Sequence, residues 1–111
     1  MEREEEAKSI RIVIADDHPL ILDALNNLFR FEKDFQVVAE CRDGVDTMEA
    51  VRKYQPDILV LDIRMPGKDG LQVLWEINAE KLATRVVLLT AEMDEDQVVD
   101  AMRLGVKGIV L

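Results

Sequence analysis

The sequence is poor in the residues that mark several classes of protein. Its one cysteine, Cys41, excludes an internal disulfide and a cysteine-cluster metal site. Aromatic residues make up only 5% of the 111 residues, so a core must come mainly from valine, isoleucine and leucine. No apolar run is long enough to span a membrane, and no charged-then-apolar leader opens the chain. We therefore expect no membrane association and a cytoplasmic location.

Basic residues are also scarce, with 14 Lys and Arg against 23 Asp and Glu, and the formal net charge is −9. A domain this acidic is repelled by phosphate backbones, and no basic stripe with interleaved aromatics offsets the repulsion. We expect no direct nucleic-acid binding by this segment. Residues 1–8, M-E-R-E-E-E-A-K, are a block rich in acids. They are predicted to form a flexible acidic tail outside the core.

From Ser9 onward, short β-rich runs alternate with segments that have helical spacing. The runs are continuous rather than alternating in polarity, which is typical of strands covered on both faces in a parallel sheet. The predicted strands span residues 10–15, 35–41, 58–61, 86–89 and 108–111.

Four amphipathic segments separate the predicted strands. Five strands joined by four helices predict a doubly wound parallel α/β sheet, in which ligands bind outside the carboxyl ends of the strands. The predicted apolar stripes are Ile21, Ala24, Leu25 and Leu28; Thr47, Ala50, Val51 and Tyr54; Leu71, Leu74 and Trp75; and Val98, Ala101, Met102 and Gly105.

Polar side chains follow three of the predicted strands. Asp16 and Asp17 follow the first, Asp62 the third and Thr90 the fourth. One acid alone is most simply an N-cap of the next helix, but this combination favours a site. Three carboxylates in one cleft repel each other unless a cation neutralises them, and oxygen ligands suit Mg²⁺. A carboxylate beside such an ion can accept a phosphoryl group as an aspartyl phosphate.

Four motifs together resemble the receiver domains of bacterial two-component response regulators: D-D-H-P (16–19), L-D-I-R-M-P-G-K-D-G (61–70), L-L-T-A (88–91) and G-V-K-G-I-V-L (105–111). The resemblance covers residues 9–111 and is strongest to the NarL/FixJ type, whose receivers precede a helix-turn-helix DNA-binding domain. It implies a flavodoxin-like fold with strand order 2-1-3-4-5. It also implies a switch rather than a turnover enzyme, a sensor histidine kinase as partner, and an output in transcription regulation.

The resemblance also assigns roles to single positions. Asp62 matches the phospho-acceptor, which also contacts the metal, and Asp17 matches the direct acidic Mg²⁺ ligand. Asp16 matches the neighbouring acid that helps to hold the ion. Arg64 matches the position whose backbone carbonyl completes the metal site. Thr90 matches the hydroxyl that hydrogen-bonds a phosphoryl oxygen and shifts when the domain switches.

The sequence departs from the family pattern near its last residues. The family's lysine would directly follow Leu111, and the fifth helix is absent, so we hypothesise that the chain is truncated after the fifth strand. We expect the sheet face left bare to favour a homodimer through exposed sheet or helix faces. Ile109 stands where the family often carries an aromatic ring, which predicts an altered switch.

Two alternatives stay open. One is a phosphorylation-impaired, receiver-like docking module, which Ile109 and the lysine position favour mildly. The other is a phosphatase of the haloacid dehalogenase type, although such enzymes carry a D-x-D pattern after the first strand that is missing here. His18, the only histidine, is interpreted as part of a helix start rather than as a catalytic group.

Overall fold

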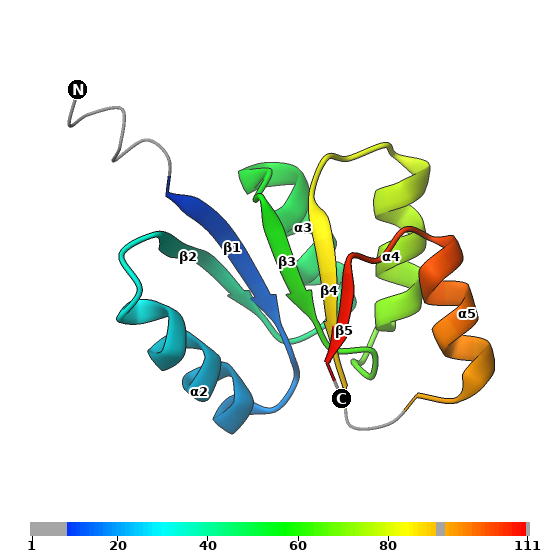
Figure 1. The fold of residues 1–111 in the computed structure, drawn as a ribbon, viewed down its shortest axis with the longest axis horizontal. Coiled ribbons are helices and arrows are strands. Elements are labelled where there is room, and N and C mark those ends of the chain that lie inside the picture. Colours follow the sequence, from blue (N-terminus) through cyan, green and yellow to red (C-terminus); the bar gives the residue numbers. More distant parts are fainter. Residues whose placement is uncertain (1–8, 91–92, 111) are drawn as a thin grey trace.

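The structure is a computed structural model and describes residues 9–90 and 93–110. Five parallel strands form one sheet in the order β2-β1-β3-β4-β5, which confirms the predicted fold and strand order (Figure 1). The strands are β1 (Ile10–Ala15), β2 (Phe35–Cys41), β3 (Ile58–Leu61), β4 (Arg85–Leu89) and β5 (Gly108–Val110). The predicted strand bounds hold, except that β4 begins one residue earlier. The predicted tail 1–8, Ala91 and Leu111 lie outside the described residues.

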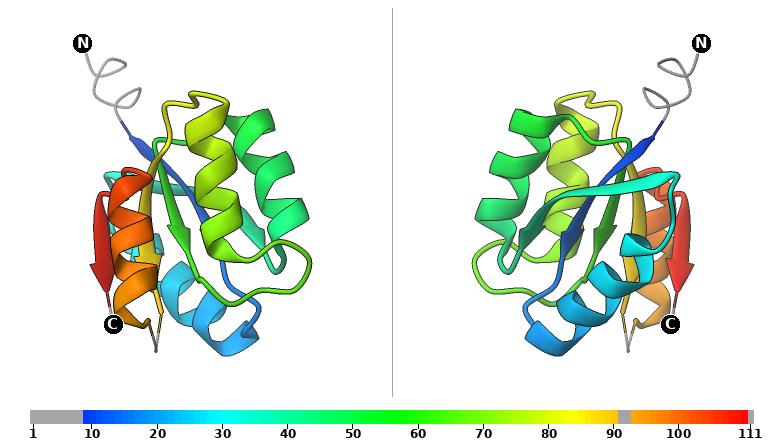
Figure 2. Two further views of the ribbon diagram at one scale, coloured as in Figure 1. Left: turned by 90° about the vertical axis from the view of Figure 1, so that its right-hand side faces the viewer. Right: turned by 90° about the vertical axis from the view of Figure 1, so that its left-hand side faces the viewer.

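Four helices cover the two faces of the sheet. Helix α2 (Pro19–Arg30) packs on one face, while α3 (Gly44–Tyr54), α4 (Gly70–Ala79) and α5 (Glu95–Arg103) pack on the other (Figures 1 and 2). In the described part of the chain no helix follows β5, and no helix is long and apolar enough to cross a membrane.

Three of the helices begin at an aspartate that caps the first turn. Asp43, Asp69 and Asp94 each accept a hydrogen bond from the backbone amide three residues later. Asp94 is part of a full capping box with Gln97. Helix α2 begins instead at Pro19, whose fixed φ suits a first turn. These helix starts determine where the loop that follows each strand ends.

The core forms two layers because side chains alternate across each strand. On one side of β1, Val13 and Ala15 join the large cluster beneath α3, α4 and α5. On the other side, Ile12 and Ile14 pack with Leu22 of α2 in a smaller cluster.

The predicted apolar stripe of α2 is wrong except at Leu25. Ile21 and Leu28 are 40% and 62% exposed, whereas Leu22 is buried and Leu25 and Phe29 pack beside it. The helix carries two overlapping apolar stripes at helical spacing, and periodicity alone does not decide between them. Contact with β1 and β2 selects the stripe that contains Leu22.

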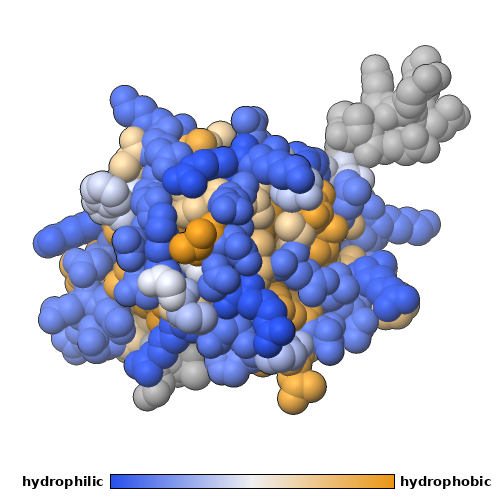
Figure 3. Space-filling view, turned by 180° about the vertical axis from the view of Figure 1, so that it is seen from behind, coloured by the Kyte–Doolittle hydropathy of each residue, from blue (hydrophilic) through white to orange (hydrophobic). Residues whose placement is uncertain are grey.

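The stripes of α4 and α5 are confirmed in part. Leu74 and Ala101 are buried as predicted, but Trp75 and Met102 are 57% and 66% exposed. These two side chains lie outside the contact with the sheet. Seen from behind, the molecule shows hydrophilic side chains around smaller apolar areas (Figure 3).

Candidate functional site

The predicted acids meet at the carboxyl ends of β1 and β3, which are neighbours in the sheet. The Asp62 amide donates to the Ala15 carbonyl over 2.9 Å, so Asp62 lies one residue beyond β3 and beside the acids that follow β1. Asp16 and Asp62 are 4% and 6% exposed. Donor atoms of Asp16, Asp17, His18 and Asp62 all lie within 4.8 Å of one another. We call these four residues the acid cluster.

The loop from Asp62 to Asp69 is held by close backbone packing. The Gly70 amide donates to the Ile63 carbonyl over 2.7 Å, and a Cβ on Gly70 would lie 2.5 Å from the Asp62 carbonyl oxygen. A Cβ on Gly44, at the start of α3, would collide with the Lys68 backbone. Only glycine allows these approaches, so the two helix starts clamp the loop and thereby position Asp62.

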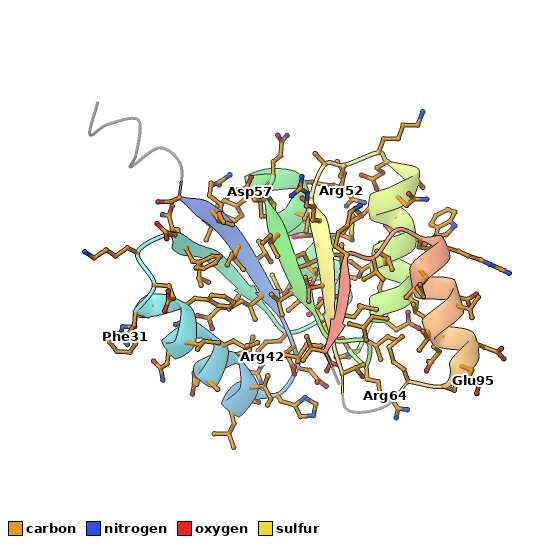
Figure 4. The ribbon with its side chains drawn as sticks, in the orientation of Figure 1. Phe31, Arg42, Arg52, Asp57, Arg64 and Glu95 are labelled. Atoms are coloured by element: carbon orange, nitrogen blue, oxygen red, sulfur yellow. The ribbon has the colours of Figure 1, made fainter. Side chains whose placement is uncertain are left out.

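Arg64 contributes its backbone to the site. Its amide donates to Asp62 Oδ1 over 3.3 Å, while its side chain is exposed and points beyond the carboxyl ends of the strands (Figure 4). A hollow of about 450 Å³ adjoins the acid cluster, and its walls include Asp17, Arg64, Pro66 and Gln97. The acid cluster is therefore open to small solutes from this side.

His18 is the site residue whose place the sequence interpretation missed. It does precede α2 as expected, but its side chain makes no cap. Its Nδ1 instead lies 2.7 Å from Asp16 Oδ1, 3.0 Å from Asp17 Oδ1 and 3.8 Å from Asp62 Oδ2. The hydrogen bond to Asp16, together with the charges of the three acids, raises the pKa of His18. The adjacency of histidine to two acids in D-D-H-P was the available signal.

Asp62 sits in an environment that disfavours its charge. Burial raises its pKa, the hydrogen bond from the Arg64 amide lowers it, and the charges of Asp16 and Asp17 raise it again. A nearby cation would stabilise the ionised form, because it would offset both the burial and the repulsion.

The acid cluster fits a divalent cation. Asp17 Oδ1 is buried and accepts no hydrogen bond in the described part of the chain, and its 3.0 Å approach to His18 Nδ1 is not a hydrogen bond. Buried polar oxygens are rarely left without a hydrogen bond, so this oxygen is available to bind a cation. Three carboxylates are hard oxygen donors of the kind that Mg²⁺ prefers. The residues present could therefore hold Mg²⁺.

Thr90 lies at the carboxyl end of β4, the strand next to β3. It is 6% exposed, and its amide donates to the Val110 carbonyl over 3.0 Å. Ile109 is partly buried and pairs with Leu88 in the register between β4 and β5. Thr90 is thus at the same end of the sheet as the acid cluster.

A family model described as the response regulator receiver domain matches residues 12–111. The chain belongs to this family. The match spans most of the chain and agrees with the sheet order and with the acids at the carboxyl ends of β1 and β3. It confirms the predicted receiver domain and favours it over the phosphatase alternative. Receiver domains of response regulators are switch domains.

Similar proteins support the NarL type. The receiver domain is 35% identical to the "Probable transcriptional regulatory protein NarL" of Mycobacterium tuberculosis, covering 94% of this chain and 48% of that protein. It is 35% identical to the "Oxygen regulatory protein NreC" of Staphylococcus aureus, covering 92% and 48%. The chain therefore spans about half the length of the curated relatives it matches.

A solved structure gives the same result. The signal receiver domain of NarL from M. tuberculosis superposes with a TM-score of 0.89 at 35% identity, covering 94% of this chain and 84% of that one. The likeness covers most of this chain, so the two proteins share the receiver fold.

Proposed function

We propose that Asp62 accepts a phosphoryl group from a sensor histidine kinase and that Asp16, Asp17, Asp62 and the Arg64 carbonyl hold Mg²⁺ during the transfer. The observation that carries this proposal is the convergence of three carboxylates beside an open hollow. A carboxylate oxygen of Asp62 attacks phosphorus while the bond from phosphorus to the kinase histidine nitrogen breaks. The histidine keeps the electron pair of that bond.

Different residues of the receiver domain would make different contributions to the phosphoryl transfer. The loop clamped by Gly44 and Gly70 presents the Asp62 carboxylate in one orientation. Thr90 would donate its hydroxyl hydrogen to a phosphoryl oxygen. When bound, Mg²⁺ would neutralise charge on the carboxylates and on the phosphoryl group. The added phosphate charge would then bias the surface around α5 and β5, which is how such a modification acts as a switch.

The output would be transcription regulation through a DNA-binding domain outside this segment, by analogy with the relatives named above. The net charge of −9 supports the expectation that this segment itself does not contact nucleic acid. The proposed receiver domain comprises residues 9–111, with residues 1–8 as a separate tail. A homodimer through exposed apolar side chains such as Met102 and Val110 would be a further part of the switch.

Intact-mass spectrometry after incubation with a small phosphodonor and Mg²⁺ tests the proposal. We expect one phosphate adduct on the natural chain and none on Asp62→Asn. Asp23→Asn, which removes an equal charge from the exposed surface of α2, is the matched control and should be modified normally. No adduct on the natural chain would contradict the acceptor role and favour the docking-module alternative.

A further inference from the structure

The side chain of His18 is directed at the three carboxylates of the acid cluster although nothing in helix α2 requires it. It makes no helix cap, and 65% of the side chain is exposed. Its Nδ1 nevertheless lies within 4 Å of oxygens from Asp16, Asp17 and Asp62, at 2.7, 3.0 and 3.8 Å. One nitrogen thus faces all three carboxylates.

One of these contacts is the hydrogen bond to Asp16, and all three oxygens lie close enough to Nδ1 to share one ion with it if that hydrogen bond is given up. In an octahedral site with bonds of about 2.1 Å, adjacent ligand atoms lie roughly 3 Å apart and opposite ones roughly 4 Å apart. The distances from His18 Nδ1 to Asp16, Asp17 and Asp62 lie close to that range. Asp17 Oδ1 is buried and accepts no hydrogen bond among the described residues, and its charged contact is the one with His18 Nδ1, so it is available as a ligand.

The donor set that includes His18 differs chemically from the oxygen set proposed for Mg²⁺. Mg²⁺ prefers oxygen ligands and retains several waters, whereas imidazole nitrogen suits borderline transition ions such as Zn²⁺. The same pocket therefore offers one ligand set to a hard ion and another to a borderline ion. The choice between them depends on whether the His18 ring takes part.

We infer that the acid cluster binds cations in two modes: Mg²⁺ on oxygen ligands without His18, and a borderline divalent transition ion on His18 Nδ1 together with the carboxylates. The inference rests on the proposed Mg²⁺ site. In the second mode the imidazole takes a coordination position that a phosphoryl oxygen would otherwise use. Ions of the Zn²⁺ class would then hold the receiver domain in a form that does not accept phosphate.

The test uses Zn²⁺ and Mg²⁺ as separate probes of the untagged chain. His18 is the only histidine, so imidazole ¹⁵N spectra report on this residue alone. We expect Zn²⁺ to shift Nδ1 to the resonance of a metal-bound nitrogen, and Mg²⁺ to leave it without such a shift. By calorimetry, His18→Gln should weaken Zn²⁺ binding by about tenfold to a hundredfold, the range seen when support of a metal site is lost, and should not weaken Mg²⁺ binding.

Two results would overturn the inference: an Nδ1 resonance that shows no metal-bound shift with Zn²⁺, or equal Zn²⁺ affinity in His18→Gln and the natural chain. The spectra use the natural chain, so this arm does not depend on the folding of a variant. Asp17→Ala removes a carboxylate of both modes and should abolish Mg²⁺ binding, whereas His18→Gln should weaken Zn²⁺ binding alone, so the two variants together separate the two proposals. If the natural chain binds no Mg²⁺, the proposed function loses its metal site whatever the Zn²⁺ result.

Discussion

The charged and polar groups are paired in hydrogen bonds at the amino ends of the strands, whereas like charges gather at the carboxyl ends. At the amino ends of the strands, Asp57 accepts a hydrogen bond from the Arg11 amide over 2.8 Å, and the Thr84 hydroxyl donates to the Pro56 carbonyl over 2.8 Å. At the carboxyl ends, three carboxylates lie together with His18 as the nearby ionisable base (Figure 4 shows Asp57 and Arg64 at opposite ends).

The larger hollow lies at the end with the balanced charges. A space of about 580 Å³ at the amino ends is lined by residues that include Gln55, Lys81 and Arg85, against about 450 Å³ beside the acid cluster. Cavity size would therefore point to the end of the sheet opposite the acid cluster. Unbalanced charge on buried groups is the better indicator, because such an arrangement costs stability and is retained where it serves a ligand.

The largest effect is expected from Gly70→Ala, which would break the carboxyl-end geometry. The added methyl would collide with the Asp62 carbonyl and the Ile63 Cα, so we expect the free energy of unfolding to fall by about 3 kcal/mol, the upper end of overpacking costs. Urea denaturation measures the change. Gly108→Ala is the matched control, because its methyl would meet Val87 at an ordinary 3.7 Å. Equal losses in both variants would contradict the clamp.

The next effect concerns the amino ends, where hydrogen bonding rather than repulsion dominates. Thr84→Val keeps the shape of a buried side chain but removes its hydrogen bond to the Pro56 carbonyl. We expect a loss of about 1–3 kcal/mol in the free energy of unfolding, because the carbonyl loses its partner. Thr84→Ser, which retains the hydroxyl, should lose less. A Thr84→Val chain as stable as the natural one would remove the contrast between the two ends.

Asp62→Asn should raise the free energy of unfolding, and by less than Gly70→Ala and Thr84→Val lower it. Burial together with Asp16 and Asp17 raises the pKa of Asp62, so its folded state holds the proton more tightly than its unfolded state does. The contribution of Asp62 to the free energy of unfolding is therefore fully present below the ordinary carboxyl pKa of about 3.9. It is lost as the pH rises through the raised pKa of the folded state.

Without divalent cations, we expect Asp62→Asn to be more stable than the natural chain at pH 7, by up to about 1 kcal/mol, and equally stable at pH 3. Urea denaturation at both pH values measures the difference, with Asp23→Asn as the control for a change in net charge. A variant that is less stable at pH 7 would show that the Asp62 charge is already compensated.

The smallest effect tests whether charge also holds the loop after β3. Lys68 Nζ lies 2.7 Å from Glu76 Oε2, and Arg52 Nη2 lies 3.3 Å from Glu76 Oε1. A double-mutant cycle with Lys68→Met and Glu76→Gln should give a coupling of about 0.2–1 kcal/mol, since these pairs are partly exposed. A coupling as large as the effect of Gly70→Ala would mean that charge, not backbone packing, positions the loop.

Much of the fold follows from local patterns in the sequence. The continuous apolar runs and the helix starts at Asp43, Asp69 and Asp94 depend on residues close together in the chain. Once the sheet is parallel, Asp16 and Asp62 must lie at the same edge, so the acid cluster was predictable as well.

The tertiary structure decided what depends on contacts between distant segments. Helix α2 has two apolar stripes, and only its packing on β1 and β2 selects Leu22 over Ile21. His18 contacts Asp16 and Asp17, its neighbours in the chain, and only the parallel pairing of β1 with β3 brings the distant Asp62 carboxylate within 3.8 Å of its Nδ1. Periodicity and capping act within a few residues, whereas burial and electrostatics act through space. The sequence therefore determined the strands, the helix starts and the positions of the acids, and the tertiary structure decided which side chains are buried and how His18 lies among the three carboxylates.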